Sequence, residues 1–274
     1  MLISECSGGG DHQRAKWIQT LVNGLPFDTC TLDARGMGES DGLSTYSNHY
    51  EETEDTKAVM DHLAKEYGLW TLCLIGHSKG AGSTLLLAEK YPHLFPPLVI
   101  FLNSLYFLNG RPERLADRTF SKWQLWNDVR TKGPQEQSKY RHKGKILPYI
   151  VVKQDLDIRE TMDLDAAARR VPPHVRVLNI TGEKDPIAPP EDVREWDTPF
   201  LATSSVAGRN TMAVLKGVAH TYREKAEQDA LTKECRDWLL KWAPVVALER
   251  KKQGLPVGFL NGGGRGGASK VSRL

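Results

Sequence analysis

The chain has 274 residues, of which 40% are hydrophobic and 26% are charged, as is typical of a soluble globular protein with a large core. Its formal net charge is +3, but residues 249–274 hold six of the 37 basic residues and one of the 34 acidic ones, which leaves −2 on the rest. The basic excess therefore belongs to the C-terminal segment, and the remaining chain lacks the basic character expected of a nucleic-acid-binding protein.

Short apolar runs alternate along the chain with longer amphipathic stretches, and the two patterns predict strands and helices respectively. In chain order the predicted elements are a strand at 2–6, a helix at 12–22, a strand at 27–32, a helix at 50–66, a strand at 70–75, a helix at 79–91, strands at 97–103, 175–180 and 211–216, and a helix at 222–241. Because parallel strands need crossover connections, this alternation favours an α/β fold with a mostly parallel sheet flanked by helices.

One long segment, residues 106–170, departs from the alternation. It carries many charges and an aromatic cluster formed by Phe120, Trp123 and Trp126, with no clear strand before residues 146–152. A segment of this length within a compact domain is usually functional, so we expect a mostly helical lid inserted after a strand.

The remaining residues divide into a core and a tail. Residues 1–105 and 171–245 contain the predicted strands and are expected to form a single core. Residues 246–274 are predicted to form a basic, Gly-rich tail that is disordered, because it has too few apolar side chains to offset the entropy lost on ordering.

Cysteine spacing and hydropathy restrict the class of protein further. The four cysteines (6, 30, 73 and 235) include no Cys-x-x-Cys pair and no nearby His cluster, so neither a disulfide framework nor a metal site is expected. The first residues lack the basic and apolar regions of a signal peptide, and no apolar run is long enough to span a bilayer. We therefore expect a soluble, cytoplasmic protein.

Two stretches share the pattern Gly-x-Ser-x-Gly, which is typical of a nucleophilic serine on a sharp turn between a strand and a helix. They are "GESDG" at 38–42 and "GHSKG" at 76–80. An apolar strand leads directly into the second motif and an apolar helix follows it, whereas loop residues lie on both sides of the first. Ser78 is therefore the candidate nucleophile, and Ser40 is predicted to be a turn residue.

A serine nucleophile needs a general base, and the base needs an acid that orients it. In hydrolases with such a sheet the chain order is Ser, then Asp or Glu, then His, each acid and base following a later strand. Asp185 follows the predicted strand 175–180, and His220 lies between the last strand and the last helix. These positions predict a triad of Ser78, Asp185 and His220, with Glu183 as the alternative acid.

The mechanism also needs two backbone N–H groups directed at the developing oxyanion. The amide of Lys79 follows the candidate nucleophile at a helix N-terminus and is the first predicted donor. The second is expected in the loop "ECSGGGDHQ" after the first strand, where we favour Gly9 and where Gly8 or Gly10 could replace it. The Lys79 ammonium group is expected to lie in solvent.

These motifs resemble the α/β-hydrolases, in particular the serine aminopeptidase S33-type group and the cinnamoyl (feruloyl) esterase-like proteins. The resemblance covers roughly residues 3–243 and rests on "LDARGMGESDG", "YEETEDTKAVMDHL", "LIGHSKGAGSTLLLAEKYP", "VLNITGEKDPIAPPEDV" and "LKGVAHTY". It implies a carboxylic-ester hydrolase or a related acyl transfer, with Ser78, Asp185 and His220 as the triad and no cofactor.

The sequence departs from this family pattern in two places. The family usually has His-Gly before the oxyanion residue, where this chain has Ser7-Gly8. The fold also normally begins one or two strands earlier, so either further residues precede Met1 or the sheet has an exposed edge, which would invite pairing with another chain.

The expected function is hydrolysis of a small-molecule ester, with no nucleic-acid partner. The aromatic cluster of the expected lid favours an apolar or aromatic acyl group. Two alternatives remain: an aminopeptidase-like amide hydrolase, and a weakly active hydrolase-fold protein that binds a ligand. The aminopeptidase would need acidic lid residues to hold the substrate amine, for which the candidates are Glu113, Asp117, Glu136 and Asp155.

Overall fold

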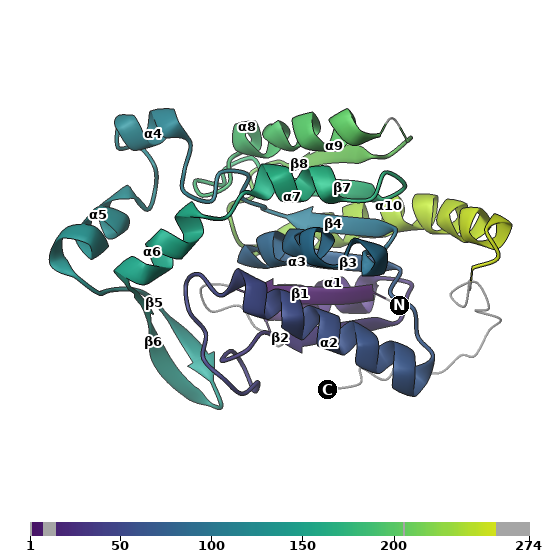
Figure 1. Ribbon diagram of the computed structural model, residues 1–274, viewed down its shortest axis with the longest axis horizontal. Helices are drawn as coiled ribbons and strands as arrows, with labels where there is room; N and C mark the ends of the chain where they lie inside the picture. Colours follow the sequence, from purple (N-terminus) through teal and green to yellow (C-terminus); the bar gives the residue numbers. More distant parts are fainter. Residues whose placement is uncertain (1, 8–14, 205, 256–274) are drawn as a thin grey trace.

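A six-stranded parallel sheet forms the centre of the molecule (Figure 1). The computed structural model describes residues 2–7, 15–204 and 206–255. In spatial order the strands are β2 (Thr29–Asp33), β1 (Leu2–Ser7), β3 (Cys73–Ser78), β4 (Leu98–Leu102), β7 (Arg176–Gly182) and β8 (Asn210–Leu215). Every pairing between these neighbours is parallel, which confirms the predicted α/β fold.

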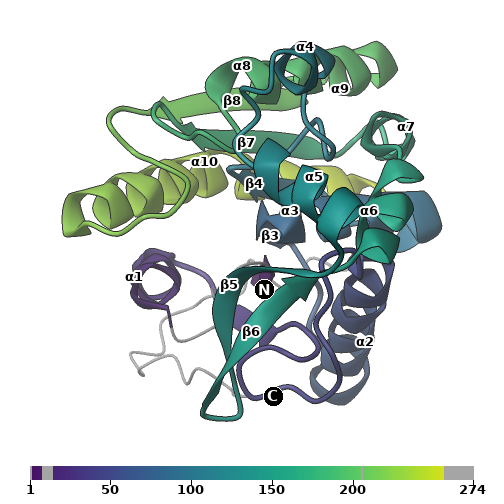
Figure 2. The same cartoon turned by 90° about the vertical axis from the view of Figure 1, so that its left-hand side faces the viewer.

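Helices cover both faces of this sheet (Figure 2). On one face lie α1 (Lys16–Gly24) and α10 (Lys225–Lys252). On the other lie α2 (His49–Tyr67), α3 (Lys79–Lys90), α7 (Leu164–Arg170), α8 (Pro190–Val193) and α9 (Asp197–Thr203), with the short 3₁₀ helices η1 (Pro92–Leu94) and η2 (Arg194–Trp196). Burial on both faces explains why a central strand such as β4, with the sequence "LVIFL", is a continuous apolar run.

Strand β4 illustrates how one strand contributes to both layers. Val99 and Phe101 pack into the layer under α2 and α3, whereas Leu98, Ile100 and Leu102 pack toward α1 and α10. All five side chains are at most 1% exposed. Successive side chains of a strand point to opposite faces, so the two core layers are joined along each central strand.

The segment between β4 and β7 differs from the predicted, mostly helical lid. It contains α4 (Pro112–Ala116), α5 (Trp123–Lys132), an antiparallel hairpin of β5 (Gln135–His142) and β6 (Lys145–Val151), and α6 (Lys153–Glu160). We refer to residues 106–163 as the insertion, because α7 packs against α3 in the main core. The insertion lies beyond the carboxyl ends of the central strands (Figure 1).

The insertion packs around a small core that also includes Met37 and Tyr46 of the body. Phe120 and Trp126, two members of the aromatic cluster, are buried there with their ring centroids 4.9 Å apart. Trp123 lies beside them under the guanidinium group of Arg118. These aromatic side chains therefore stabilise the insertion itself.

The first Gly-x-Ser-x-Gly motif forms the loop on which the β5–β6 hairpin docks. The backbone N–H of Gly38 donates to the carbonyl of Arg141 at 2.9 Å, and the N–H of Lys143 donates to the carbonyl of Gly38 at 2.6 Å. The Ser40 hydroxyl donates to the backbone carbonyl of Asp33 at 2.6 Å. Ser40 thus lies in a loop, hydrogen-bonded to the backbone.

Helix α10 extends seven residues into the segment that was predicted to be a disordered tail from residue 246. Val246 and Ala247 are buried under the sheet, and the carboxylate of Glu249 accepts two hydrogen bonds from the Arg176 guanidinium at 2.7 and 2.9 Å. These contacts hold the end of the helix in place. The later part of the predicted tail, residues 256–274, lies outside the described residues.

None of the described helices has both the length and the apolar character needed to cross a bilayer.

Candidate active site

Ser78 occupies the sharp turn between β3 and α3 that the second motif predicts. Its backbone has φ 53° and ψ −115°, an unusual conformation for a residue with a side chain. A Cβ atom on Gly76 would lie 2.7 Å from the Cα of Ala81 and from the carbonyl oxygen of Gly80, so only glycine fits there. This conformation holds the Ser78 side chain at the end of the strand.

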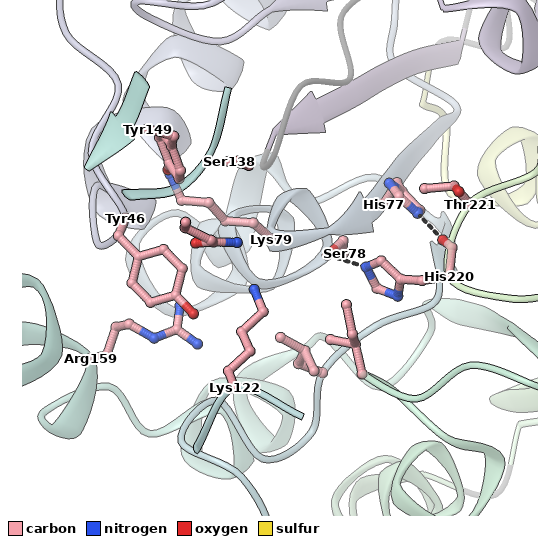
Figure 3. Close-up of a pocket in the computed structure, with 13 residues that line it drawn as sticks. Tyr46, His77, Ser78, Lys79, Lys122, Ser138, Tyr149, Arg159, His220 and Thr221 are labelled. Atoms are coloured by element: carbon pink, nitrogen blue, oxygen red, sulfur yellow. Dashed lines mark hydrogen bonds between the residues drawn. The ribbon is translucent and has the colours of Figure 1, made fainter. Parts of the chain in front are cut away.

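Three side chains from distant parts of the sequence meet at this turn. The Nε2 atom of His220 lies 2.9 Å from Ser78 Oγ (Figure 3). Its Nδ1 atom lies 2.8 Å from Asp185 Oδ2. Because a carboxylate can only accept, Nδ1 carries the proton and Nε2 accepts the hydrogen bond from the serine hydroxyl. The structure thus brings Ser78, His220 and Asp185 into one hydrogen-bonded chain.

The Asp185 carboxylate is held firmly in a fully buried position. Its Oδ1 atom accepts hydrogen bonds from the backbone N–H groups of Ile187 and Ala188 at 2.7 and 2.9 Å. Burial raises the pKa of Asp185, but hydrogen bonding to His220 and to these amides outweighs it, so the pKa lies below its usual value. Glu183, the alternative acid, accepts instead from the backbone N–H of Gly217 at 2.8 Å.

Asn103, which the sequence analysis did not single out, anchors the loop that carries His220. Its Nδ2 atom donates to the carbonyl of His220 at 2.7 Å, and its Oδ1 accepts from the backbone N–H of Gly182 at 2.9 Å. The Nε2 atom of His77 lies 3.0 Å from the same carbonyl. Asn103 follows β4 with φ 48°, a conformation that Asn tolerates better than most residues. An Asn at the carboxyl end of the predicted strand 97–103 was the only available signal.

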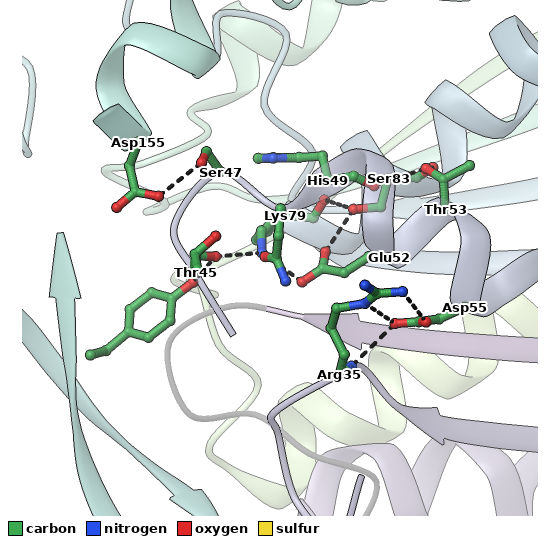
Figure 4. Close-up of polar contacts among 12 residues, drawn as sticks. Arg35, Thr45, Ser47, His49, Glu52, Thr53, Asp55, Lys79, Ser83 and Asp155 are labelled. Atoms are coloured by element: carbon green, nitrogen blue, oxygen red, sulfur yellow. Dashed lines mark hydrogen bonds and ion pairs between the residues drawn. The ribbon is translucent and has the colours of Figure 1, made fainter. Parts of the chain in front are cut away.

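The side chain of Lys79 contradicts the expectation that it lies in solvent (Figure 4). It is 8% exposed, and its ammonium group lies 2.5 Å from Glu52 Oε1 and 2.9 Å from the carbonyl of Thr45, and also contacts Asn48. The second oxygen of Glu52 accepts a hydrogen bond from Ser83 Oγ at 2.8 Å. A buried ammonium group needs a buried carboxylate, so Glu52 of α2 and Lys79 of α3 pair between the two helices.

Of the two predicted oxyanion donors, one lies within the described residues and the other does not. Lys79 is the first residue of α3, so its amide follows Ser78 at a helix N-terminus. Gly9 lies outside the described residues. In the sheet register Ser7 is the partner of Ser78, so β1 ends beside the candidate nucleophile.

Ser78 and His220 open into a cavity of about 230 Å³. The body of the protein contributes Tyr46, Leu105, Ile187 and Thr221 to its wall, besides the residues of the turn. The insertion contributes Lys122, Gln137, Ser138, Tyr149 and Arg159. The aromatic cluster at 120–126 is not part of this lining, so it does not indicate an aromatic acyl group.

The insertion side of the cavity is positively charged. The Arg159 guanidinium carbon lies 4.6 Å from the ring centroid of Tyr46, and Lys122 Nζ lies 5.3 Å from it. Burial raises the pKa of Tyr46, but the positive charges of Lys122 and Arg159 outweigh it, so the pKa lies below its usual value. No three His, Cys, Asp or Glu side chains gather as a metal site would require in the part of the chain described.

Comparison with known proteins identifies the family of this chain. The serine aminopeptidase S33 family matches residues 3–224. The chain belongs to this family. The family and the fold together make it a hydrolase of the α/β-hydrolase type.

Individual relatives agree with this assignment. The 2-(acetamidomethylene)succinate hydrolase of Mesorhizobium japonicum is 29% identical over 104 residues, which are 38% of this chain and 36% of that protein. The match thus spans about a third of the length of the curated relative.

Solved structures share the fold, as two of them illustrate. The monoacylglycerol lipase of Paleococcus ferrophilus has a TM-score of 0.61 at 19% identity, with 88% of this chain and 94% of that one covered. Est1E from Butyrivibrio proteoclasticus, solved with ferulic acid bound, has a TM-score of 0.61 at 16% identity, with 88% of each chain covered.

Proposed function

We propose that the protein is a serine hydrolase that cleaves carboxylic esters through an acyl-enzyme. Ser78 would be the nucleophile, His220 the general base and Asp185 the residue that orients the imidazole. The observation that carries this proposal is the unbroken hydrogen-bonded chain from Ser78 Oγ through His220 to Asp185.

The reaction follows from the roles of these groups. His220 Nε2 takes the hydroxyl proton as Ser78 Oγ attacks the ester carbonyl, while the Asp185 carboxylate stabilises the imidazolium that forms. The imidazolium then gives the proton to the leaving alkoxide, and the acyl group stays on Ser78. A water molecule, deprotonated by His220, attacks this acyl-enzyme and releases the acid.

The oxyanion of each tetrahedral intermediate would be held by the backbone N–H of Lys79. Each such donor contributes about 3 kcal/mol of transition-state stabilisation. We assign the second donor to the loop after β1, with Gly9 as the proposed residue, because β1 ends beside Ser78. The Lys79–Glu52 ion pair fixes the first turn of α3, from which the first amide projects.

The charges around the cavity favour an ester over an aminopeptidase substrate. Lys122 and Arg159 would repel the ammonium group of a peptide N-terminus. Asp155, one of the candidate amine-binding acids, accepts hydrogen bonds from Ser47 Oγ at 2.8 Å and from the backbone N–H of Val152 at 3.0 Å. The carboxylate of Asp155 is therefore occupied by hydrogen bonds within the insertion and to the body of the protein.

Labelling with a neutral fluorophosphonate probe tests the nucleophile. The Ser40→Ala variant should label like the wild type, and Ser78→Ala should not label and should lose at least about 10⁴-fold in kcat for p-nitrophenyl butyrate. Equal labelling of the two variants would contradict the proposal.

The same preparation distinguishes the alternatives. Turnover of an aminoacyl p-nitroanilide with higher kcat/KM than the ester would favour the aminopeptidase. Labelling of Ser78 without turnover of any ester would favour a ligand-binding protein.

A further inference from the structure

We propose that the ester hydrolysed at this site also carries an anionic group, of which a carboxylate is the smallest example, and that Lys122 and Arg159 bind it. This inference rests on the proposed function and names its substrate class.

Both cations lie in the wall of the cavity into which Ser78 and His220 open. Lys122 immediately precedes α5, and Arg159 lies on α6. Figure 3 shows the ammonium group of Lys122 pointing toward the middle of the pocket, between Tyr46 and Ser78, with the Arg159 guanidinium group beside Tyr46. A substrate acylating Ser78 would therefore have both cations within the same enclosed space.

Neither cation is neutralised by the described protein. The third cation of the cavity, Lys79, pairs with Glu52, but no ion pair within the described residues involves Lys122 or Arg159. Asp155, one turn before Arg159 on α6, is bonded to other groups. The positive charge of this wall is thus available to a ligand.

Arg159 also has hydrogen-bonding capacity left over. The residue is 3% exposed, and its Nη2 atom donates to the carbonyl of Leu108 at 2.5 Å. Its Nε atom is buried and has no hydrogen-bond partner. A buried charged donor without a partner is costly, which is why such groups in native proteins normally have one. An anionic ligand in the adjacent cavity would compensate the guanidinium charge.

The Tyr46 ring, which both cations contact, supports the same conclusion. Tyr46 is 5% exposed, and its hydroxyl accepts a hydrogen bond from Trp126 Nε1 at 3.2 Å. The hydroxyl proton remains available to a further acceptor, and the adjacent positive charges make it more acidic. A carboxylate would thus meet an ammonium, a guanidinium and a phenol donor in one place.

Hydrogen bonds to charged groups are stronger than neutral ones, and those made here would form away from bulk water. We expect the anionic ester to be preferred over a matched neutral ester by roughly 10- to 100-fold in kcat/KM. The preference should fall when Lys122 is replaced by a residue of similar length without charge.

The test compares two ester pairs, in each of which a free carboxylate is converted to its neutral methyl ester. In the first, mono-p-nitrophenyl adipate is compared with its methyl ester, so the charge lies on the acyl side. In the second, 4-butyryloxybenzoate is compared with its methyl ester, so the charge lies on the alcohol side. The quantity measured is the ratio of kcat/KM for the anionic and the neutral member of each pair.

Lys122→Met should lower this ratio by about 10-fold in at least one pair. Lys132→Met is the matched control, because Lys132 lies in the same insertion with a side chain that is 65% exposed, and it should keep the wild-type ratio. Comparing ratios between variants cancels the intrinsic reactivity of each ester.

Failure of the inference can be told apart from failure of the proposed function. If the neutral probe labels Ser78 and esters are hydrolysed, but the ratio in both pairs is unchanged by Lys122→Met, the anion-binding role is wrong. If Ser78 is not labelled and neither member of a pair is hydrolysed, the esterase proposal itself fails.

Discussion

Asp185 and Glu183 lie two residues apart in one loop, and their surroundings give them different roles. The Asp185 carboxylate faces His220 and is held by two backbone amides, whereas Glu183 stabilises the turn at Gly217. The residue that the sequence pattern favoured is thus the one placed next to the imidazole. The difference can be measured because both acids can be replaced by their amides.

Asp185→Asn is expected to lower kcat roughly 10³- to 10⁴-fold, because an amide cannot hold the imidazole in the required tautomer. Glu183→Gln should leave kcat near the wild-type value, because the amide oxygen can still accept from Gly217. Steady-state kinetics on a neutral p-nitrophenyl ester measure both. A larger loss in Glu183→Gln than in Asp185→Asn would exchange the two assignments.

The lowered pKa of Asp185 also links folding to pH. A carboxyl group whose pKa is lower in the folded than in the unfolded protein stabilises the fold above its unfolded pKa, about 3.9, and loses this contribution as the pH falls through the folded value. Urea unfolding should therefore show a smaller difference in unfolding free energy between the wild type and Asp185→Asn at pH 3 than at pH 5. A difference that stays constant to pH 3 would argue against the lowered pKa.

At the scale of the helices, α2 and α3 are joined by a buried ion pair. Glu52 is completely buried and joins Lys79 and Ser83, two residues of the helix that begins at the candidate nucleophile. Removing one partner of such a pair leaves a buried charge without compensation. The pair therefore couples the packing of two helices to the position of the turn.

Glu52→Gln is expected to lower the free energy of unfolding by about 3 kcal/mol. The double variant Glu52→Gln/Lys79→Met should recover part of this loss, because it removes both charges. Glu54→Gln is the control on the same helix, since its carboxylate is 38% exposed and pairs with Lys90, and it should cost less than about 1 kcal/mol. Equal losses in Glu52→Gln and Glu54→Gln would mean that burial adds nothing to the pair.

The sequence allowed the elements of the central sheet to be predicted, but within the insertion it indicated only the strand at 146–152, which corresponds to β6. Strands such as β4 are buried on both faces and appear as apolar runs. The predicted strand 70–75 lay three residues too early, since β3 continues through the turn residues to Ser78. Strand β5 has the sequence "QEQSKYRH" and buries only Tyr140, so its pattern gave no strand signal. The available clue was Lys143-Gly144, both with positive φ, a typical hairpin turn.

The residues of the candidate site could likewise be predicted only in part. Ser78, Asp185 and His220 follow predicted strands, and parallel strands bring their carboxyl ends to one edge, so their proximity could be predicted. Lys122 and Arg159 lie in different elements of the insertion, and only its folding brings them to one wall. Lys79 was placed wrongly because its partner, Glu52, is 27 residues away on another helix.

At the scale of the whole molecule, α10 closes one face of the sheet and reaches its far end. Its buried side chains pack in the same layer as α1 and the central strands, and Glu249 ties its last turns to Arg176 at the start of β7. The residues after 245 are therefore part of the folded unit as far as Lys252.

Val246→Ala should lower the free energy of unfolding by about 2 kcal/mol, because Val246 is 1% exposed in this layer. For a protein of this size the midpoint of thermal unfolding would fall by roughly 4–8 °C. Leu248→Ala is the control, since Leu248 is 55% exposed two residues along the same helix, and it should change stability by less than about 0.5 kcal/mol. A similar loss in both variants would indicate that the helix end is not packed on the sheet.

The two layers of the core each contain cysteine side chains. Cys30 belongs to the layer under α2 and α3, and Cys73 and Cys235 belong to the opposite layer. Burial raises the pKa of all three thiols, so each stays protonated and shielded in the folded protein. In a Cys6→Ser background, pulsed alkylation with peptide mass mapping would thus report the opening of each layer separately. It would reveal whether the two sides of the sheet come apart in one cooperative event or in sequence.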